Sequence, residues 1–168
     1  MSEIVIQDGI TPVLNRMLQE IQNREPILRA VGQEVVSMTR QSFTNSALRP
    51  ASWPPVKNKS GRPLYRTGAL TRSITVARTS NDSVLVSTDR PYAMFHQFGT
   101  KGPYTIRAKM AGALAWAGAR HPVKSVQHPG LPARPFFPFS ASGTVAEYAK
   151  VRISRIIATA LRKILRIQ

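Results

Sequence analysis

The stretch that decides the fold is HPGLPARPFFPF, residues 128–139. Its prolines recur at every third position, 129, 132, 135 and 138, and each one fixes φ near −65° and removes a backbone donor. Neither a helix nor a central strand accepts this spacing. The stretch also carries one leucine and three phenylalanines, more apolar surface than a solvated linker exposes. We therefore predict a stiff, extended strap across the body of the protein, with a proline-rich surface loop as the alternative.

Length and composition indicate a single domain spanning 1–168. A chain of 168 residues with 42% hydrophobic content supports one modest core. There is no cysteine, so neither a disulfide framework nor thiolate chemistry is expected. The first nine residues carry Glu3 and Asp8 where a signal peptide would be positive, and no run approaches the roughly 18 apolar residues of a membrane span. We expect a soluble protein, made and used inside a cell, with no membrane partner.

The charge of the chain is strongly positive. There are 24 Lys and Arg against 8 Asp and Glu, for a net charge of +16, and no acidic residue occurs between Arg90 and Ala146. Such a field attracts polyanions or acidic protein surfaces without selecting between them. Zinc-finger spacing, an RNA-binding aromatic signature and a basic region followed by leucine heptads are all missing from the sequence. Non-specific contact with nucleic acid therefore stays open as an alternative function.

The N-terminal part has helical patterning. Thr11-Pro12 is a good helix start, and apolar residues follow at helical spacing up to Ile21. Pro26 predicts a break near Arg24, and a second helix is expected from Pro26 to about Phe43. Its expected core residues are Ile27, Leu28, Val31, Val35 and Met38. A coiled-coil seam is the alternative, but Pro26 interrupts its heptads.

The middle of the chain begins with a long basic, proline-rich loop, 44–66. Its composition opposes independent folding, and Trp53 can fill a pocket on a partner, so we predict a protruding arm that reaches a neighbouring subunit or protein. Two β-branched runs, 73–78 and 83–88, then flank the turn-forming Ser80-Asn81-Asp82 and predict an antiparallel hairpin.

The aromatic-rich segment 92–100 predicts a core or interface element. His96 lies within it, and a structural role is favoured because no other histidine stands at metal-ligand spacing from it. Beyond it we expect a strand at 104–106 and a short alanine-rich helix over about 109–119.

The last helix is predicted from Thr144 to Ile167, a stretch without proline or glycine. Apolar residues share one broad side of it, and one set of cations gathers on the other, namely Arg152, Arg155, Arg162, Lys163 and Arg166. Solvation of the helix and its dipole explain part of this bias, but a face of one sign also suits an acidic partner or DNA. We predict that these five side chains face DNA or an acidic partner.

Four motifs occur in a recognisable order. These are LYRTGAL at 64–70, YA followed by HQFGT at 92–100, HPG at 128–130 and ARPF at 133–136. In this order, around a hairpin, they resemble the virion morphogenesis and tail-completion proteins of tailed bacteriophages, including Mu-like phages. The resemblance covers about residues 10–165 and departs at the long 44–63 loop.

The residue patterns predict N-terminal helices, a small antiparallel sheet, a proline-rich strap and a long C-terminal amphipathic helix, and the resemblance implies the matching α+β fold class. It also implies a structural protein of the neck or tail top, in the virion, assembled in the host cytoplasm as a ring of six subunits with other neck and tail proteins as partners. No cofactor and no metal are expected, and the protein is not expected to be an enzyme. A hydrolase that used His96 would need an acid or nucleophile brought beside it by the fold. Because apolar side chains are buried by assembly, we predict an interface made by Trp53, Phe95, Phe98, Arg134 and Phe136.

Overall fold

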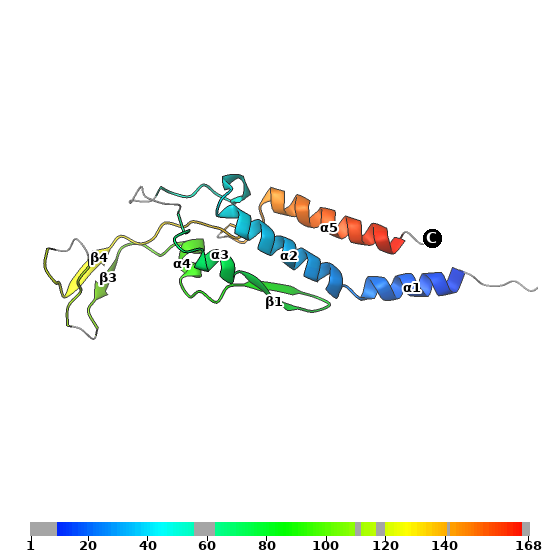
Figure 1. Cartoon of the computed structure of the whole chain (residues 1–168), viewed down its shortest axis with the longest axis horizontal. Coiled ribbons are helices and arrows are strands. Elements are labelled where there is room, and N and C mark those ends of the chain that lie inside the picture. Colours follow the sequence, from blue (N-terminus) through cyan, green and yellow to red (C-terminus); the bar gives the residue numbers. More distant parts are fainter. Residues whose placement is uncertain (1–9, 56–62, 110–111, 117–119, 141, 166–168) are drawn as a thin grey trace, which may run out of the picture.

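The computed structural model describes residues 10–55, 63–109, 112–116, 120–140 and 142–165. The molecule is elongated, with helix α2 near its middle, helix α1 at one end and the β3–β4 hairpin at the other (Figure 1). The elements in chain order are α1 Ile10–Gln22, α2 Glu25–Ser42, the 3-10 turn η1 Ser46–Leu48, α3 Ala69–Ser73, β1 Thr75–Thr79, β2 Val84–Ser87, α4 Ala93–Phe98, β3 Tyr104–Arg107, β4 Ser125–His128 and α5 Glu147–Leu165. The predicted α+β class is confirmed.

The predicted break between the two N-terminal helices is confirmed at residues 23–24. Asn81, in the turn between β1 and β2, stabilises this break. Its side-chain oxygen accepts the backbone N–H groups of Arg24 and Glu25, and its amide donates to the carbonyl of Gln22 at 2.6 Å. One turn residue therefore satisfies backbone groups that two helix ends leave unpaired.

Helix α2 is the centre of the fold, because α5 packs against it and the β1–β2 hairpin also contacts it (Figure 1). The hairpin approaches closely at Gly32, where an added Cβ would lie 2.5 Å from a methyl group of Val84. The main core cluster is Val36, Phe43, Leu70, Ile74, Ala93 and Phe136. Of the residues expected in the core from α2, Val31 and Met38 are buried, while Ile27, Leu28 and Val35 are half-buried.

Two separate antiparallel hairpins occur in the described part of the chain, where one small sheet was predicted. β1 pairs with β2, and β3 pairs with β4. The expected alanine-rich helix over 109–119 is wrong for its described part: 112–116 is not helical, Gly112 has φ +66°, and Leu114 instead forms an isolated bridge with Val123. A left-handed glycine interrupts a helix at this point, and the cross-strand partner continues the β3–β4 pairing.

The C-terminal helix α5 begins at Glu147, three residues later than predicted. The strap holds the preceding residues, since Val145 bridges to Phe139 and the N–H of Ala146 donates to the carbonyl of Pro138. The apolar side of α5 is only partly covered: Ala149 is buried, but Ile157 and Leu161 are 39% and 41% exposed. Within the described residues, no helix combines the length and hydrophobicity needed to cross a membrane.

Candidate assembly surfaces

The strap is an extended segment that other parts of the chain hold in place. Phe136 is fully buried at its centre, tilted against Phe43 with ring centroids 5.4 Å apart. Gln97 of α4 supplies the hydrogen bonds that a neighbouring strand would give. Its side-chain oxygen accepts the N–H groups of Phe136 and Phe137 at 2.9 and 3.0 Å, and its amide donates to the carbonyl of Phe139 at 3.0 Å. The predicted strap across the body is confirmed.

The end of α4 fits the strap backbone closely. Gly99 has φ +75°, and a Cβ there would lie 2.7 Å from the carbonyl oxygen of Leu131. The backbone N–H of Arg134 donates to the carbonyl of His96 at 2.7 Å. The HQFGT and ARPF motifs are thus two sides of one contact. Sequence reasoning singled out both motifs but missed Gln97, whose signal was a polar residue inside an otherwise apolar segment.

Three of the five residues predicted at an interface pack within their own chain. The expectation that Phe136 is exposed is wrong, because the core closes over it. Arg134 is 9% exposed and donates to the carbonyls of Pro54 and Pro55 at 3.2 and 3.1 Å. Proline-rich backbone makes few bonds of its own, so its carbonyls are free to accept from an arginine.

Trp53 is the third residue that packs at home. Its indole nitrogen donates to the carbonyl of Pro135 at 2.7 Å, its ring meets Phe43 edge to face, and the Arg49 guanidinium lies 3.8 Å above it. The first half of the predicted 44–66 arm, as far as residue 55, is therefore docked on the chain that carries it. Residues 56–62 of the arm lie outside the described part of the structure.

Phe95 and Phe98 remain available to a partner. They are 44% and 51% exposed, and Met94 of the same helix is 59% exposed. The opposite side of α4 is buried through Ala93 and Gln97. The strap holds this buried side of α4 in place through Gln97. The exposed side of the helix therefore presents three apolar residues in a fixed position. Isolated apolar residues are ordinary on a surface, but a contiguous group of this kind marks contact sites.

The basic face of α5 is less uniform than predicted. Arg152 forms an ion pair with Glu34 of α2, and both side chains are largely covered, so this cation is already partnered within its own chain. Arg155 and Arg162 are exposed. Lys163 lies at the rim of a groove, and Arg166 lies outside the described residues. Pairing with Glu34 sets Arg152 apart from the other predicted cations, because a half-buried cation is stabilised by an opposite charge.

His96 has the surroundings of a structural residue. It is half-buried and its ring meets Tyr92 edge to face, with centroids 5.9 Å apart. Burial lowers the pKa of His96, and the positive charge of Arg134 lowers it further. Its Nδ1 is buried and has no hydrogen-bond partner among the described residues. Among all the residues that the structure describes, no group of three or more His, Cys, Asp and Glu residues could hold a metal ion.

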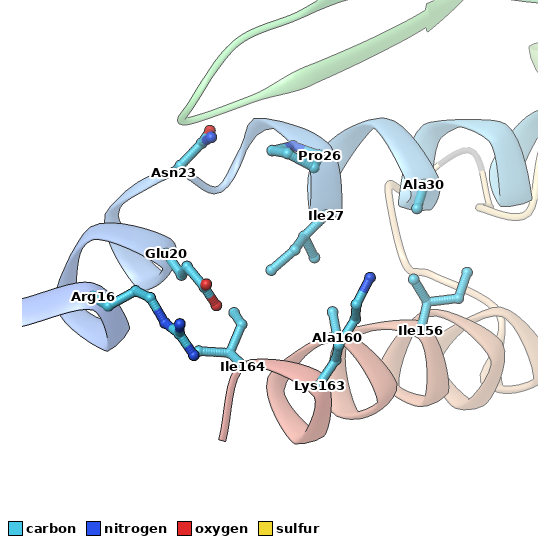
Figure 2. Close-up of a pocket in the computed structure, with 10 residues that line it drawn as sticks. All are labelled: Arg16, Glu20, Asn23, Pro26, Ile27, Ala30, Ile156, Ala160, Lys163 and Ile164. Carbon is cyan, nitrogen blue, oxygen red and sulfur yellow. The ribbon is translucent and has the colours of Figure 1, made fainter. Parts of the chain in front are cut away.

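A groove between α1, α2 and α5 was not anticipated (Figure 2). Its volume is about 470 Å³, and its apolar lining comes from Pro26, Ile27, Ala30, Ile156, Ala160 and Ile164. Arg16 and Glu20 reach toward it from α1, and Lys163 from α5 (Figure 2). The sequence signal for this groove was the apolar stripe of the second N-terminal helix. Periodicity alone assigns such residues to a core and does not reveal a groove.

Comparison with known proteins places these surfaces in context. The sequence profile of the phage virion morphogenesis family matches residues 6–162. The Mu-like prophage FluMu G protein 2 of Haemophilus influenzae is 38% identical over 103 residues, which cover 60% of this chain and 72% of that protein. No solved structure matches the chain.

Proposed function

Because this chain belongs to the phage virion morphogenesis family, we propose that it is a structural subunit of the neck or tail top, forming a ring that completes the tail and joins it to the head. Six subunits are expected, with other neck and tail proteins as neighbours. The ring is assembled in the host cytoplasm and retained in the virion. The described residues serve this role as a scaffold, since the buried hydrogen bonds of Gln97, Ser42 and Trp53 converge on one extended strap.

The observation that carries this proposal is the outer face of α4. Met94, Phe95 and Phe98 are exposed on a short helix whose inner face is fixed by the strap. A rigid apolar patch loses little conformational entropy on binding, which favours specific contacts between subunits. A closed ring gives every subunit two different contact faces and buries such patches all around.

A complementation experiment tests the proposal. A phage that lacks this gene product is expected to accumulate filled heads and separate tails, and the wild-type protein supplied in trans should restore joined particles. Native mass spectrometry of the purified protein, or electron microscopy of tails, should show a cyclic oligomer. Normal joined particles without the protein would overturn the proposal. Phe95→Ser with Phe98→Ser should reduce joining, whereas the matched change of exposed Thr105 and Ser125 to alanine should not.

Non-specific nucleic-acid binding is the second candidate. It is favoured by the net charge of +16 and by the segment 100–128, which has five Lys and Arg residues and no acid. Lysine and arginine neutralise phosphates irrespective of sequence, so affinity should fall steeply with salt. Filter-binding titrations of duplex DNA over a range of salt concentrations separate this candidate from a purely structural role.

A further inference from the structure

Helix α1 exposes an apolar stripe that the other described residues do not cover. Leu14, Leu18 and Ile21 are 52%, 56% and 44% exposed, and no residue of α1 is buried. The helix has 13 residues, about the length at which an isolated helix is marginal in water. Arg16 and Glu20 of α1 point toward the groove beside α5 (Figure 2), and they lie roughly opposite the stripe on the helix. The stripe is therefore separate from the side of α1 that carries Arg16 and Glu20.

The charge of α1 selects the kind of partner. The helix carries one arginine and one glutamate, so its formal charge is zero in a protein of net charge +16. DNA or an acidic protein would be drawn to the basic surfaces instead. Two copies of this chain repel each other over most of their surface, and a neutral apolar helix is where that repulsion is weakest. In the proposed ring, α1 is therefore the surface at which two copies meet with the least repulsion.

The same chain offers a complementary surface on the α2–α5 side of this groove, whose other side is lined by Arg16 and Glu20 of α1. Its floor is apolar, and Ala30 and Ala160 are small enough to let another helix approach closely. The exposed side chains of Ile157 and Leu161 continue the apolar surface along α5.

We propose that α1 of one subunit places Leu14, Leu18 and Ile21 on the α2–α5 groove of the next subunit. The stripe and the groove are different surfaces, so the contact is head-to-tail, which is the type of contact that closes into a ring. This inference rests on the proposed ring and names the surfaces that join its subunits.

Cysteine cross-linking tests the contact directly, because the natural chain has no cysteine. Leu14→Cys and Ala160→Cys are made in separate proteins, mixed in equal amounts and treated with a short bifunctional maleimide. We expect a covalent dimer that appears only in the mixture, with the 14–160 link identified by peptide mass spectrometry. The matched control replaces Leu14→Cys by Gln19→Cys, which lies on the other side of α1 and should link at least about tenfold less.

Several results would overturn the contact. A Leu14→Cys protein that links only to itself would assign α1 to a symmetric pair. Equal linking from position 19, or no linking in a sample that still forms rings, would exclude the groove. A link from position 14 to another virion protein alone, in assembled particles, would assign the stripe to that protein.

A second variant keeps the test independent of the proposed function. Leu14→Gln with Leu18→Gln should leave the fold intact, because both side chains are exposed, and should weaken self-association at least about tenfold by analytical ultracentrifugation. The control is Asn15→Ala with Gln19→Ala. Rings that persist unchanged in the leucine variant would sink this inference and leave the proposed function standing. Particles that join normally without the protein would remove the proposed function whatever the cross-links show.

Discussion

The side-chain oxygen of Gln97 lies 2.9 Å from the backbone nitrogen of Phe136, so a helix residue does for the strap what a neighbouring strand would otherwise do. The strap cannot pair as a strand because prolines remove its donors. Its few remaining N–H groups need acceptors when they are buried. Gln97 serves two of them and also donates to the carbonyl of Phe139, so its side chain joins α4 to the strap alongside the His96–Arg134 backbone hydrogen bond.

Gln97→Ala should destabilise the protein by about 2 to 4 kcal/mol, because it leaves buried N–H groups at 136 and 137 without acceptors. The free energy of unfolding, measured by urea denaturation, checks this. Gln41→Ala is the matched control: Gln41 is exposed and bonds only Ser37 through its side chain, so its loss should stay within about 0.5 kcal/mol. A Gln97 variant as stable as the control would contradict this account of the strap.

Trp53→Ala should lower the stability of the single subunit, because this side chain packs within its own chain. The indole hydrogen bond to Pro135 and the contact with Phe43 would both be lost. For a half-buried tryptophan the cost should be about 2 to 4 kcal/mol. Trp53→Phe retains the ring contact but not the hydrogen bond and should cost less. If Trp53→Ala unfolds like the wild type but fails to assemble, the side chain acts on a partner instead.

Arg155→Gln together with Arg162→Gln should leave the free energy of unfolding within about 1 kcal/mol, because both side chains are exposed and no ion pair is found for them among the described residues. The salt dependence of DNA binding and the yield of joined particles should both be measured. An unchanged salt slope with full genome retention would exclude a DNA role for this face. Normal head–tail joining in the same variant would exclude a docking role as well.

Arg152→Gln is the matched comparison on the same helix. Its loss leaves Glu34, which is 21% exposed, without its cation. We therefore expect this single change to reduce stability more than the double change at 155 and 162 does. Equal effects would show that the Arg152–Glu34 pair contributes no more than an ordinary surface charge.

The stability of the protein should fall as the pH drops below the usual pKa of histidine, about 6.5. Burial first, and then the charge of Arg134, lower the pKa of His96 in the folded state. The unfolded chain therefore binds a proton at a higher pH than the folded one, and the stability present above the unfolded pKa is lost as the pH falls through the folded pKa. Denaturation curves between pH 7.5 and 5 should show a smaller loss for His96→Gln than for the wild type. Parallel losses would assign the pH dependence to other groups.

The sequence by itself determined the features that follow from local chemistry. Pro26 predicted the break between α1 and α2, the turn residues 80–82 predicted the first hairpin, and the proline spacing of 128–139 predicted the strap. These predictions hold because proline and turn residues restrict the backbone wherever they occur. The family resemblance was also visible in the sequence, because it is carried by short motifs. In the structure, two of these motifs, HQFGT and ARPF, contact each other.

Only the tertiary structure decided which apolar and charged side chains are covered. The predicted interface includes four large aromatic side chains, Trp53, Phe95, Phe98 and Phe136. Phe136 is in the core, while Phe95 and Phe98 are exposed. Arg152 and Arg155 share a helix, but Glu34 of α2 stands beside only the first. Burial and pairing depend on residues far apart in the chain, and periodicity reports which face of a helix is apolar without reporting what lies against that face. The exposed stripe of α1 is the clearest example.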